Sequence, residues 1–313
     1  MGSHRRAGVR GLLQSTRFAQ AGHLDVPQSC RCPGHRRGGD RVTATDSSHG
    51  KALRLGRLSR RGDGRYLFIP LDHSVSEGPV TTSPAFTGLV ADVTAAGADA
   101  VVVHRGRARL IDTSALNGAG LVVHLSASTS HAPDSDAKVL VASVEDAVRL
   151  GADGVSVHVN IGSDTEERQL GDLGAVASEC DRMGMPLLAM VYLRGPRVVD
   201  PHDARTLAHV VSIAADLGAD LVKTSWTNPV ERLRDVVTAS PIPVLVAGGP
   251  SVAGDLAGYA RDVITAGCAG LAVGRRVFEH PSPGDAVRSL TAAVHRRGTP
   301  PVPTSTRTLA GTP

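Results

Sequence analysis

The residue best suited to take part in a chemical reaction is Lys223, which ends the short apolar segment 220–223. The 34 Lys and Arg residues of the chain include only three lysines, Lys51, Lys138 and Lys223. Lys51 precedes the first apolar segment and Lys138 lies in a polar run, so we expect both to be solvated. Lys223 ends an apolar segment, where partial desolvation favours the neutral amine that attacks carbonyl carbons. A strand-end lysine paired with a carboxylate is the structural alternative.

Two other strand-end residues extend this chemistry. Tyr192 ends the apolar segment before that of Lys223 and is placed to move a proton to or from a substrate hydroxyl. Its alternative role is to pack its ring and expose its hydroxyl. Asp72 ends the first apolar segment and can accept a proton or hold a substrate hydroxyl. A helix cap or an arginine partner is the structural alternative for Asp72.

Eight apolar segments must position these residues. They have the composition of buried parallel strands, and the segments between them carry the helical spacing of apolar residues. Four of the strands follow a glycine that is suited to end a helix, in the near-repeat Gly-Ala-Asp or a variant of it. Eight such units in about 250 residues predict an α/β fold, the (β/α)₈ TIM barrel. The predicted strands are 65–72, 99–104, 120–124, 153–158, 186–192, 220–223, 243–248 and 269–274.

A doubly wound open sheet is the alternative fold, but a G-x-G-x-x-G turn is missing after the first strand. We expect the barrel to span residues 49–298. Residues 1–48 are rich in Arg, Gly, Ser and His without sustained apolar periodicity, which predicts a disordered basic extension. Residues 299–313 are rich in Pro and Thr and are predicted to form a loose tail.

The composition of the chain limits the kinds of molecule that the protein is expected to bind. The formal net charge is +4, with much of the excess in the first sixty residues and no basic stripe with interleaved aromatic residues, so we expect no nucleic acid partner. No apolar run approaches the ~20 residues that span a bilayer, so no membrane is expected. The four scattered cysteines favour a reduced, cytoplasmic setting over a disulfide framework. Small-molecule substrates are the expected partners.

The C-terminal ends of barrel strands open on one face, where active sites lie. The ends of the last two predicted strands carry Gly248, Gly249, Gly274 and Arg275. Glycines there let backbone N–H groups approach an anion, and phosphate binding after strands seven and eight recurs in barrels. Turn glycines with surface arginines are the structural alternative.

Histidines end four consecutive predicted strands and suggest a rival site. They are His73, His104, His124 and His158. Imidazoles around one mouth can hold a divalent metal, as in a metal-dependent lyase or hydrolase. We expect no metal, because the first strand has no H-x-H pair and a lysine with a tyrosine is superfluous to a metal-assisted mechanism. A catalytically silent barrel that binds a phosphorylated ligand is a further alternative.

Several motifs together carry a family resemblance, and they lie at residues 69–79, 124–130, 138–141, 156–164, 189–195, 222–225, 246–250 and 272–275. From about Leu53 to His295 their order and spacing resemble the archaeal-type class I aldolases, nearest to the 2-amino-3,7-dideoxy-D-threo-hept-6-ulosonate synthase branch. The resemblance implies that Lys223 forms the Schiff base, Tyr192 donates a proton and Asp72 is the general base. It also implies a sugar-phosphate cradle of the three glycines and Arg275, a homo-oligomer, and no cofactor.

The same resemblance implies a ketose-phosphate donor and an aldehyde acceptor, which in this branch is L-aspartate 4-semialdehyde. Ser74 and Trp226 replace a glycine and a tyrosine of the archaeal enzymes, so the donor is the more variable part. A composition heavy in Ala, Gly, Arg and Val favours the similar actinobacterial C7 synthases, which use dihydroxyacetone phosphate on the way to an aminohydroxybenzoate. The transaldolase of the archaeal branch and a fructose-bisphosphate aldolase are the alternatives.

Four further residues are candidates for binding substrate. His73 and His124 lie at predicted strand ends, on the face where the substrate is expected. Arg105 and Arg194 are candidates for the carboxylate of the acceptor, because the guanidinium fork suits carboxylates.

Overall fold

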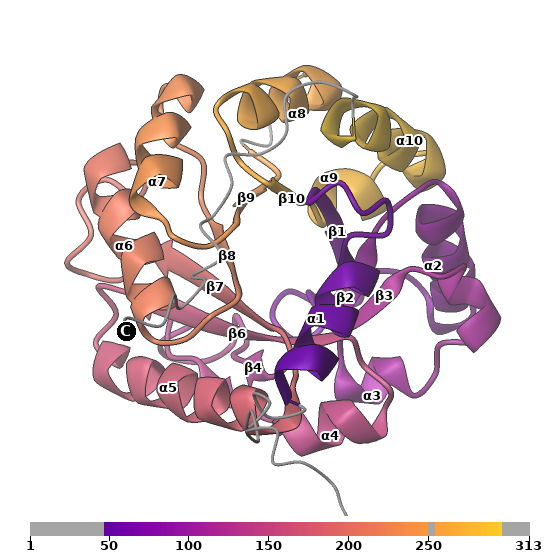
Figure 1. Ribbon diagram of the computed structural model, residues 1–313, viewed down its shortest axis with the longest axis horizontal. Coiled ribbons are helices and arrows are strands. Elements are labelled where there is room, and N and C mark those ends of the chain that lie inside the picture. Colours follow the sequence, from indigo (N-terminus) through magenta and orange to yellow (C-terminus); the bar gives the residue numbers. More distant parts are fainter. Residues whose placement is uncertain (1–46, 250–253, 296–313) are drawn as a thin grey trace, which may run out of the picture. The chain divides into compact units, whose positions relative to one another are not determined.

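The computed structural model describes residues 47–249 and 254–295, and its centre is a closed barrel of eight parallel strands. Neighbouring strands follow the order β1-β10-β9-β8-β7-β6-β3-β2 (Figure 1). The predicted TIM barrel is confirmed. The strands are β1 (Tyr66–Pro70), β2 (Ala100–His104), β3 (Gly120–His124), β6 (Gly154–Ile161), β7 (Leu187–Leu193), β8 (Leu221–Thr224), β9 (Val244–Ala247) and β10 (Gly270–Ala272). Residues 1–46 of the predicted extension and the predicted tail 299–313 lie outside the described residues.

Helices follow the strands and surround the barrel (Figure 1). Their apolar faces pack on the outside of the strands, while a second apolar cluster that includes Phe68, Val102 and Leu245 fills the inside. The helices are α2 (Phe86–Ala95), α3 (Arg105–Ala108), α4 (Val144–Arg149), α5 (Glu166–Met183), α6 (Ala204–Asp216), α7 (Leu233–Ala239), α8 (Leu256–Thr265), α9 (Arg275–Phe278) and α10 (Pro283–Val294). Short 3₁₀ helices cover Ser83–Ala85, Thr113–Leu116 and Val230–Arg232.

Helix α1 (Ser47–Leu58) closes the N-terminal end of the barrel. Its last residue, Leu58, is 1% exposed and belongs to the apolar cluster inside the barrel. Gly120 and Gly154 start two strands beside it, and a Cβ atom on Gly120 would lie 2.7 Å from the Leu58 Cδ2 atom. The glycines therefore make room for the leucine that fills the floor of the barrel.

Basic side chains of α1 and the turn after it pair with the aspartates that begin the strands. The ion pairs are Lys51–Asp220 at 3.1 Å, Arg57–Asp153 at 2.5 Å and Arg61–Asp99 at 3.3 Å. Each aspartate also accepts the backbone N–H of a neighbouring strand, as Asp99 does from Leu67 at 2.7 Å. Lys51 contacts Asp181 as well, at 2.5 Å, so the prediction that Lys51 is solvated is wrong.

His295 is predicted to make the stability of the barrel depend on pH. Its Nδ1 and Nε2 atoms lie 2.8 Å from Asp63 and 2.9 Å from Asp99. Burial alone would lower the pKa of His295, but the hydrogen bonds to both carboxylates outweigh burial and the charge of Arg61 and raise this pKa above 6.5. The stabilisation is therefore fully present below pH 6.5 and is lost as the pH rises through the folded-state pKa.

Denaturant titrations between about pH 6 and about pH 9 test this pH dependence. We expect the free energy of unfolding of the wild type to fall across this range and that of His295→Gln to fall less. Parallel curves for the two proteins would contradict the assignment.

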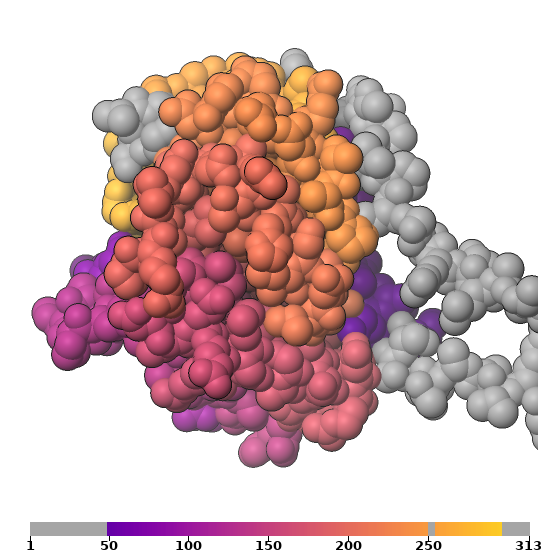
Figure 2. Space-filling model, turned by 90° about the vertical axis from the view of Figure 1, so that its left-hand side faces the viewer, coloured from indigo at the N-terminus to yellow at the C-terminus, as the bar shows by residue number. Residues whose placement is uncertain are grey.

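A small antiparallel hairpin stands outside the barrel order. Its strands are β4 (Ser126–Ala127) and β5 (Val139–Leu140), with Ala127 opposite Val139. The loop between the strands includes exposed residues and projects on the side of the molecule opposite α1 (magenta, left in Figure 2). The sequence analysis missed this hairpin, because two-residue strands are too short to show an alternating pattern.

Two compositional expectations concern residues within the barrel. No helix in the described part of the chain is long and apolar enough to span a bilayer. Cys180 and Cys268 are buried free thiols, and burial raises the pKa of each to about 12. Both thiols therefore remain protonated near neutral pH. Cys30 and Cys32 lie outside the described residues.

Candidate active site

A pocket of about 530 Å³ opens at the C-terminal ends of the strands. Side chains that end or follow all eight barrel strands line it, and its volume is in the range of pockets that hold small molecules. The strand-end residues in its lining are Asp72, His73, His104, His124, His158, Tyr192, Lys223, Gly248, Gly249, Gly274 and Arg275. The structure therefore brings these strand-end residues together in one pocket.

Lys223 lies in the wall of this pocket on β8. Its backbone pairs with Met190 on one side and Leu245 on the other, and both belong to the apolar cluster inside the barrel. The residue is 7% exposed, and no hydrogen bond or ion pair joins it to another described residue. Its side chain is therefore buried between apolar strand neighbours, and the residue lines the pocket.

Tyr192 stands next to Lys223 and closer to the mouth. It lies two residues beyond Met190 on β7, so its side chain points to the same face of the strand and about 6.6 Å further along it. The His158 ring lies 5.0 Å from the Tyr192 ring, and the Arg194 guanidinium lies 4.7 Å from the ring centre. These contacts hold the phenol ring at the pocket wall beside the amine.

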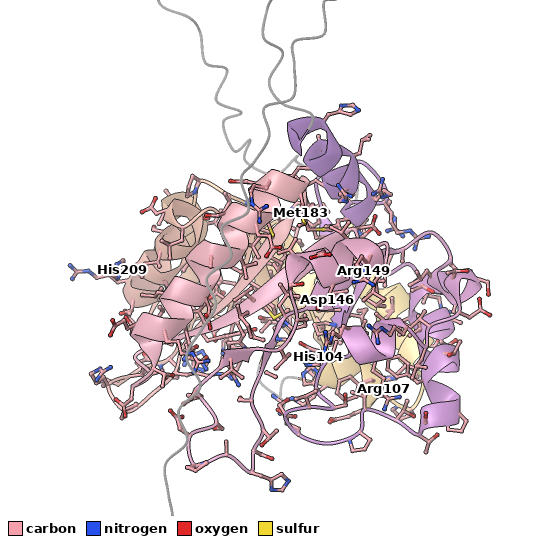
Figure 3. The ribbon with its side chains drawn as sticks, turned by 90° about the horizontal axis from the view of Figure 1, so that it is seen from below. His104, Arg107, Asp146, Arg149, Met183 and His209 are labelled. Carbon is pink, nitrogen blue, oxygen red and sulfur yellow. The ribbon has the colours of Figure 1, made fainter. Side chains whose placement is uncertain are left out.

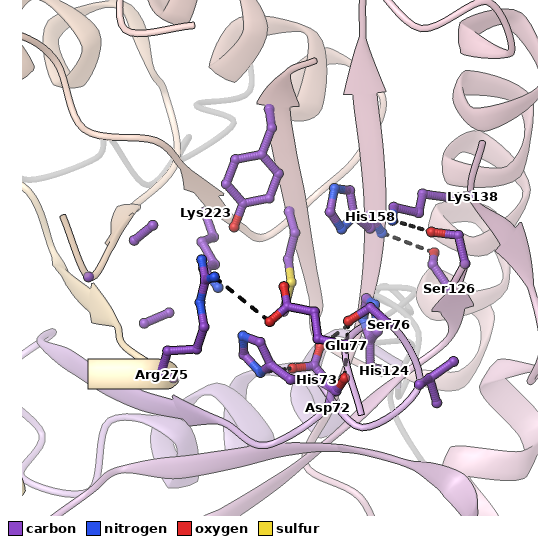
Figure 4. Close-up of a pocket in the computed structure, with 18 of the residues that line it drawn as sticks. Asp72, His73, Ser76, Glu77, His124, Ser126, Lys138, His158, Lys223 and Arg275 are labelled. Carbon is purple, nitrogen blue, oxygen red and sulfur yellow. Dashed lines mark hydrogen bonds and ion pairs between the residues drawn. The ribbon is translucent and has the colours of Figure 1, made fainter. Parts of the chain in front are cut away.

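Asp72 follows β1 and carries the carboxylate at the base of the pocket. Its oxygens lie 3.4 Å from His73 Nδ1 and 3.8 Å from His124 Nε2 (Figure 4). Burial raises the pKa of the Asp72 carboxyl, but His124, His73 and Lys223 together outweigh burial and hold this pKa below its ordinary value. Asp72 is therefore a carboxylate at neutral pH, electrostatically coupled to the amine of Lys223.

The four mouth histidines are neutral near pH 7. Burial lowers the pKa of His73, His104 and His158, and that of His124 to about 4. His124 Nδ1 lies 2.8 Å from the Ser156 hydroxyl, and His158 Nε2 lies 2.8 Å from the Asn160 amide oxygen. Among residues 47–249 and 254–295, no group of three or more His, Cys, Asp or Glu side chains is arranged to hold a metal ion.

The glycines that are predicted to bind an anion lie just after β9 and β10. Gly249 adopts a φ of 75°, and a Cβ atom there would lie 2.9 Å from the Tyr259 ring. A Cβ atom on Gly274 would lie 2.4 Å from His73 Cε1, so the His73 ring packs directly on this loop. Arg276 donates to the Gly248 carbonyl at 3.0 Å and thereby ties the two loops together.

Arg275 extends from the start of α9 over the mouth. Its guanidinium lies 3.8 Å from the Glu77 carboxylate, and both side chains are at least half exposed (Figure 4). This pair is weak because water screens it. A bound anion can therefore replace Glu77 at Arg275 at little cost.

The two arginines predicted for the acceptor carboxylate have different positions. Arg194 lines the pocket. Arg105 does not, because it begins helix α3 and its guanidinium donates to Asp146 at 2.9 Å at the start of α4. Figure 3 shows Asp146 together with Arg149 of the same helix, while His209 extends from α6 away from the barrel. The prediction for Arg105 is therefore corrected, because its guanidinium is paired outside the pocket.

The sequence analysis missed several lining residues, and Lys138 is the most important of them. Its ammonium donates to the Ser128 hydroxyl and to the Ser135 carbonyl at 2.9 Å, and it is only partly exposed. Glu77 was also missed as a lining residue. The scarcity of lysine and the motif at 138–141 were the signals for Lys138, whereas the polar run around it favoured the prediction that it is solvated; the residue is only partly exposed.

Comparison with known proteins places the chain in a family. A family model described as DeoC/LacD family aldolase matches residues 66–280, which is more than half of the chain. The chain belongs to the DeoC/LacD aldolase family. The predicted enzyme class, an aldolase, is confirmed.

This DeoC/LacD aldolase has curated relatives that match nearly their whole length. It is 44% identical over 258 residues to 2-amino-4,5-dihydroxy-6-oxo-7-(phosphonooxy)heptanoate synthase of Streptomyces griseus, covering 82% of this chain and 94% of the relative. It is 45% identical over 249 residues to 2-amino-3,7-dideoxy-D-threo-hept-6-ulosonate synthase of Halobacterium salinarum, covering 79% and 92%. The predicted resemblance to both groups of synthases is confirmed.

Solved structures agree with the sequence relatives. A Schiff-base-forming fructose-1,6-bisphosphate aldolase aligns with a TM-score of 0.70 and 28% identity, covering 78% of this chain and 100% of that one. An archaeal fructose-1,6-bisphosphate aldolase whose catalytic lysine is covalently bound to a carbinolamine intermediate aligns with a TM-score of 0.70 and 27% identity, covering 78% and 99%. The structural neighbours of this aldolase thus include enzymes that use a Schiff base.

Proposed function

We propose that this aldolase joins dihydroxyacetone phosphate to L-aspartate 4-semialdehyde and forms a C7 amino-keto-acid phosphate. The observation that carries the proposal is the buried side chain of Lys223, which lines a pocket with the predicted anion cradle at one end. The name of the Streptomyces griseus relative, a (phosphonooxy)heptanoate synthase, supports a seven-carbon phosphorylated product. Three donor carbons and four acceptor carbons give seven.

In the proposed mechanism, the Nζ atom of Lys223 adds to the ketone carbon of the donor, and loss of water gives an iminium. The iminium withdraws electrons, so the neighbouring carbon loses a proton to Asp72, the general base, and an enamine forms. The enamine carbon attacks the aldehyde carbon, and Tyr192 donates a proton to the new alkoxide. Water then hydrolyses the iminium, which releases the product and restores the amine.

The cradle orients the donor. Backbone N–H groups near Gly248 and Gly274 would bind the phosphate, with Arg275 adding positive charge. The N–H group of Gly249 donates to the Ala247 carbonyl at 2.8 Å, so Gly249 would serve by its close approach. His73, which packs on Gly274, and His124, which contacts Asp72, would donate or accept hydrogen bonds as neutral imidazoles. The phosphate would thus hold the ketone carbon next to Lys223.

Gly274→Ala tests the cradle. The added methyl group would lie 2.4 Å from His73 Cε1 and 2.9 Å from the Pro70 carbonyl, so the loop must shift. We expect the KM for the phosphorylated donor to rise about 10-fold to 100-fold, the cost of one or two charge-assisted hydrogen bonds. Gly88→Ala is the control, because a Cβ atom there meets nothing within 4 Å. An unchanged donor KM in Gly274→Ala would contradict this role.

Product analysis tests the proposed reaction. The enzyme is incubated with dihydroxyacetone phosphate and L-aspartate 4-semialdehyde, and mass spectrometry is used to find a product with the summed mass of the two substrates. The 45% identity to the archaeal ulosonate synthase favours a transaldolase as the second candidate, which would take its donor from a ketohexose phosphate. Product from a ketohexose phosphate alone would replace the first proposal with the second.

We also propose that the enzyme is a cytoplasmic homo-oligomer with a basic N-terminal extension. The resemblance to the class I aldolases supports the oligomer, and the scattered cysteines support a reduced compartment. Size-exclusion chromatography with light scattering measures the subunit number. A monomeric mass would contradict the oligomer.

A further inference from the structure

The barrel order places two polar regions of the pocket opposite each other. The anion cradle follows β9 and β10, whereas the hairpin β4–β5 follows β3 and contacts β6. Two strands separate these pairs in either direction round the barrel, β8 and β7 on one side and β1 and β2 on the other. Figure 4 shows Arg275 and Lys223 on one side of the pocket and Lys138 with His158 on the other.

The hairpin holds Lys138 at the pocket wall. Ala127 pairs with Val139, so the next antiparallel pair is Ser128 with Lys138, and the Lys138 ammonium donates to the Ser128 hydroxyl. A second donation goes to the Ser135 carbonyl at 2.9 Å. The backbone N–H of His158 donates to the Ser126 hydroxyl at 3.0 Å, which ties the hairpin to β6. The Lys138 ammonium is therefore held by two oxygens of the hairpin and its loop, and the hairpin is in turn held by β6.

The charge of Lys138 is not neutralised by an ion pair with another described residue. Two of its three N–H bonds go to uncharged oxygens, which leaves one for a ligand. Burial lowers the pKa of Lys138, and the next largest influence is the positive charge of Arg194. Asp136 and Asp134 on the loop oppose these effects more weakly. This side of the pocket thus carries two cations without a bound counterion among the described residues.

Arg194 is the second cation on the Lys138 side of the pocket. Its guanidinium lies over the Tyr192 ring at 4.7 Å, and no ion pair joins it to another described residue. The nearby imidazole of His158 is neutral, because burial holds its pKa well below 6.5. A guanidinium stacked on an aromatic ring keeps its N–H edge available for an anion.

We propose that Lys138 and Arg194 form a second anion subsite, which binds the carboxylate of the aldehyde acceptor. The inference rests on the proposed aldol reaction and adds the residues that choose its acceptor. A donor phosphate at the cradle and an acceptor carboxylate at Lys138 place the two anions at opposite ends of the pocket. The ketone carbon and the aldehyde carbon then meet between them, beside Lys223 and Tyr192.

Acceptors with and without a carboxylate test the subsite. Succinate semialdehyde carries the carboxylate, and butanal has the same four carbons without it. We expect Lys138→Met to lower kcat/KM for succinate semialdehyde about 10-fold to 100-fold and to leave kcat/KM for butanal within about twofold. Lys138→Arg keeps the charge and should recover most of the loss. Equal losses for both aldehydes in Lys138→Met would overturn the inference.

Two further measurements distinguish a failure of the anion subsite from a general effect of removing a lysine and from a failure of the proposed function. Lys51→Met removes the same charge at the opposite end of the barrel and should not change the ratio between the two acceptors. Borohydride trapping of dihydroxyacetone phosphate needs no acceptor. If the wild type shows no trapped adduct, the proposed function is contradicted, but the anion subsite is not. In that case the binding of L-homoserine, which carries the carboxylate but no aldehyde, is measured by calorimetry. We expect Lys138→Met to weaken it about tenfold, and equal affinity overturns the inference.

Discussion

Replacing Lys223 with methionine is expected to reduce turnover by about 10⁴-fold or more, because the other lysine that lines the pocket, Lys138, lies on the opposite side of it (Figure 4). Methionine has nearly the same length and suits the apolar neighbours Met190 and Leu245. The barrel should therefore keep its stability while it loses its amine. Steady-state kinetics of product formation measure the first effect, and thermal unfolding measures the second.

Lys138→Met is the matched control for this loss, because it removes a lysine from the same pocket. It is expected to weaken acceptor use and to keep the covalent step. Substantial turnover by Lys223→Met in a folded protein would contradict the role of Lys223. That result would favour the histidine-based metal site or another nucleophile.

Tyr192→Phe is expected to lower kcat by about 10²-fold to 10⁴-fold, the usual contribution of a positioned proton donor. The ring that contacts His158 and Arg194 remains, so the pocket wall is preserved and only the hydroxyl is lost. Binding of the donor phosphate should change little, because the cradle lies on other strands. The measurement is kcat and KM for both substrates.

Tyr66→Phe controls for the loss of a phenol hydroxyl elsewhere in the barrel. Tyr66 begins β1, is 7% exposed and belongs to the apolar cluster inside the barrel, but it does not line the pocket. We expect its kcat to stay within about twofold of the wild type. Equal kcat values for Tyr192→Phe and Tyr66→Phe would contradict the proton transfer assigned to Tyr192.

The barrel could be predicted because its signals are local. Each strand is a short apolar run, and the glycines at 97, 151, 218 and 267 end the preceding helices with positive φ values. Lys223, Tyr192 and Asp72 were found because the parallel barrel topology collects strand ends at one mouth.

The features that were missed depend on partners far away in the sequence. Lys51 pairs with Asp181, which lies 130 residues further along the chain, and no local pattern reports such a pair. Lys138 depends on the register of a hairpin with two-residue strands. Arg105 was misplaced because it follows a strand end, whereas helix α3 directs it to Asp146.

The measurement that tests the account most directly is borohydride trapping with dihydroxyacetone phosphate, followed by peptide mass spectrometry. The reductant converts an iminium into a stable amine, so the donor leaves a mass increment on the lysine that bound it. We expect the increment on the peptide that contains Lys223, in the presence or absence of a metal chelator. No increment on that peptide from dihydroxyacetone phosphate or any other ketose phosphate would contradict the Schiff-base mechanism.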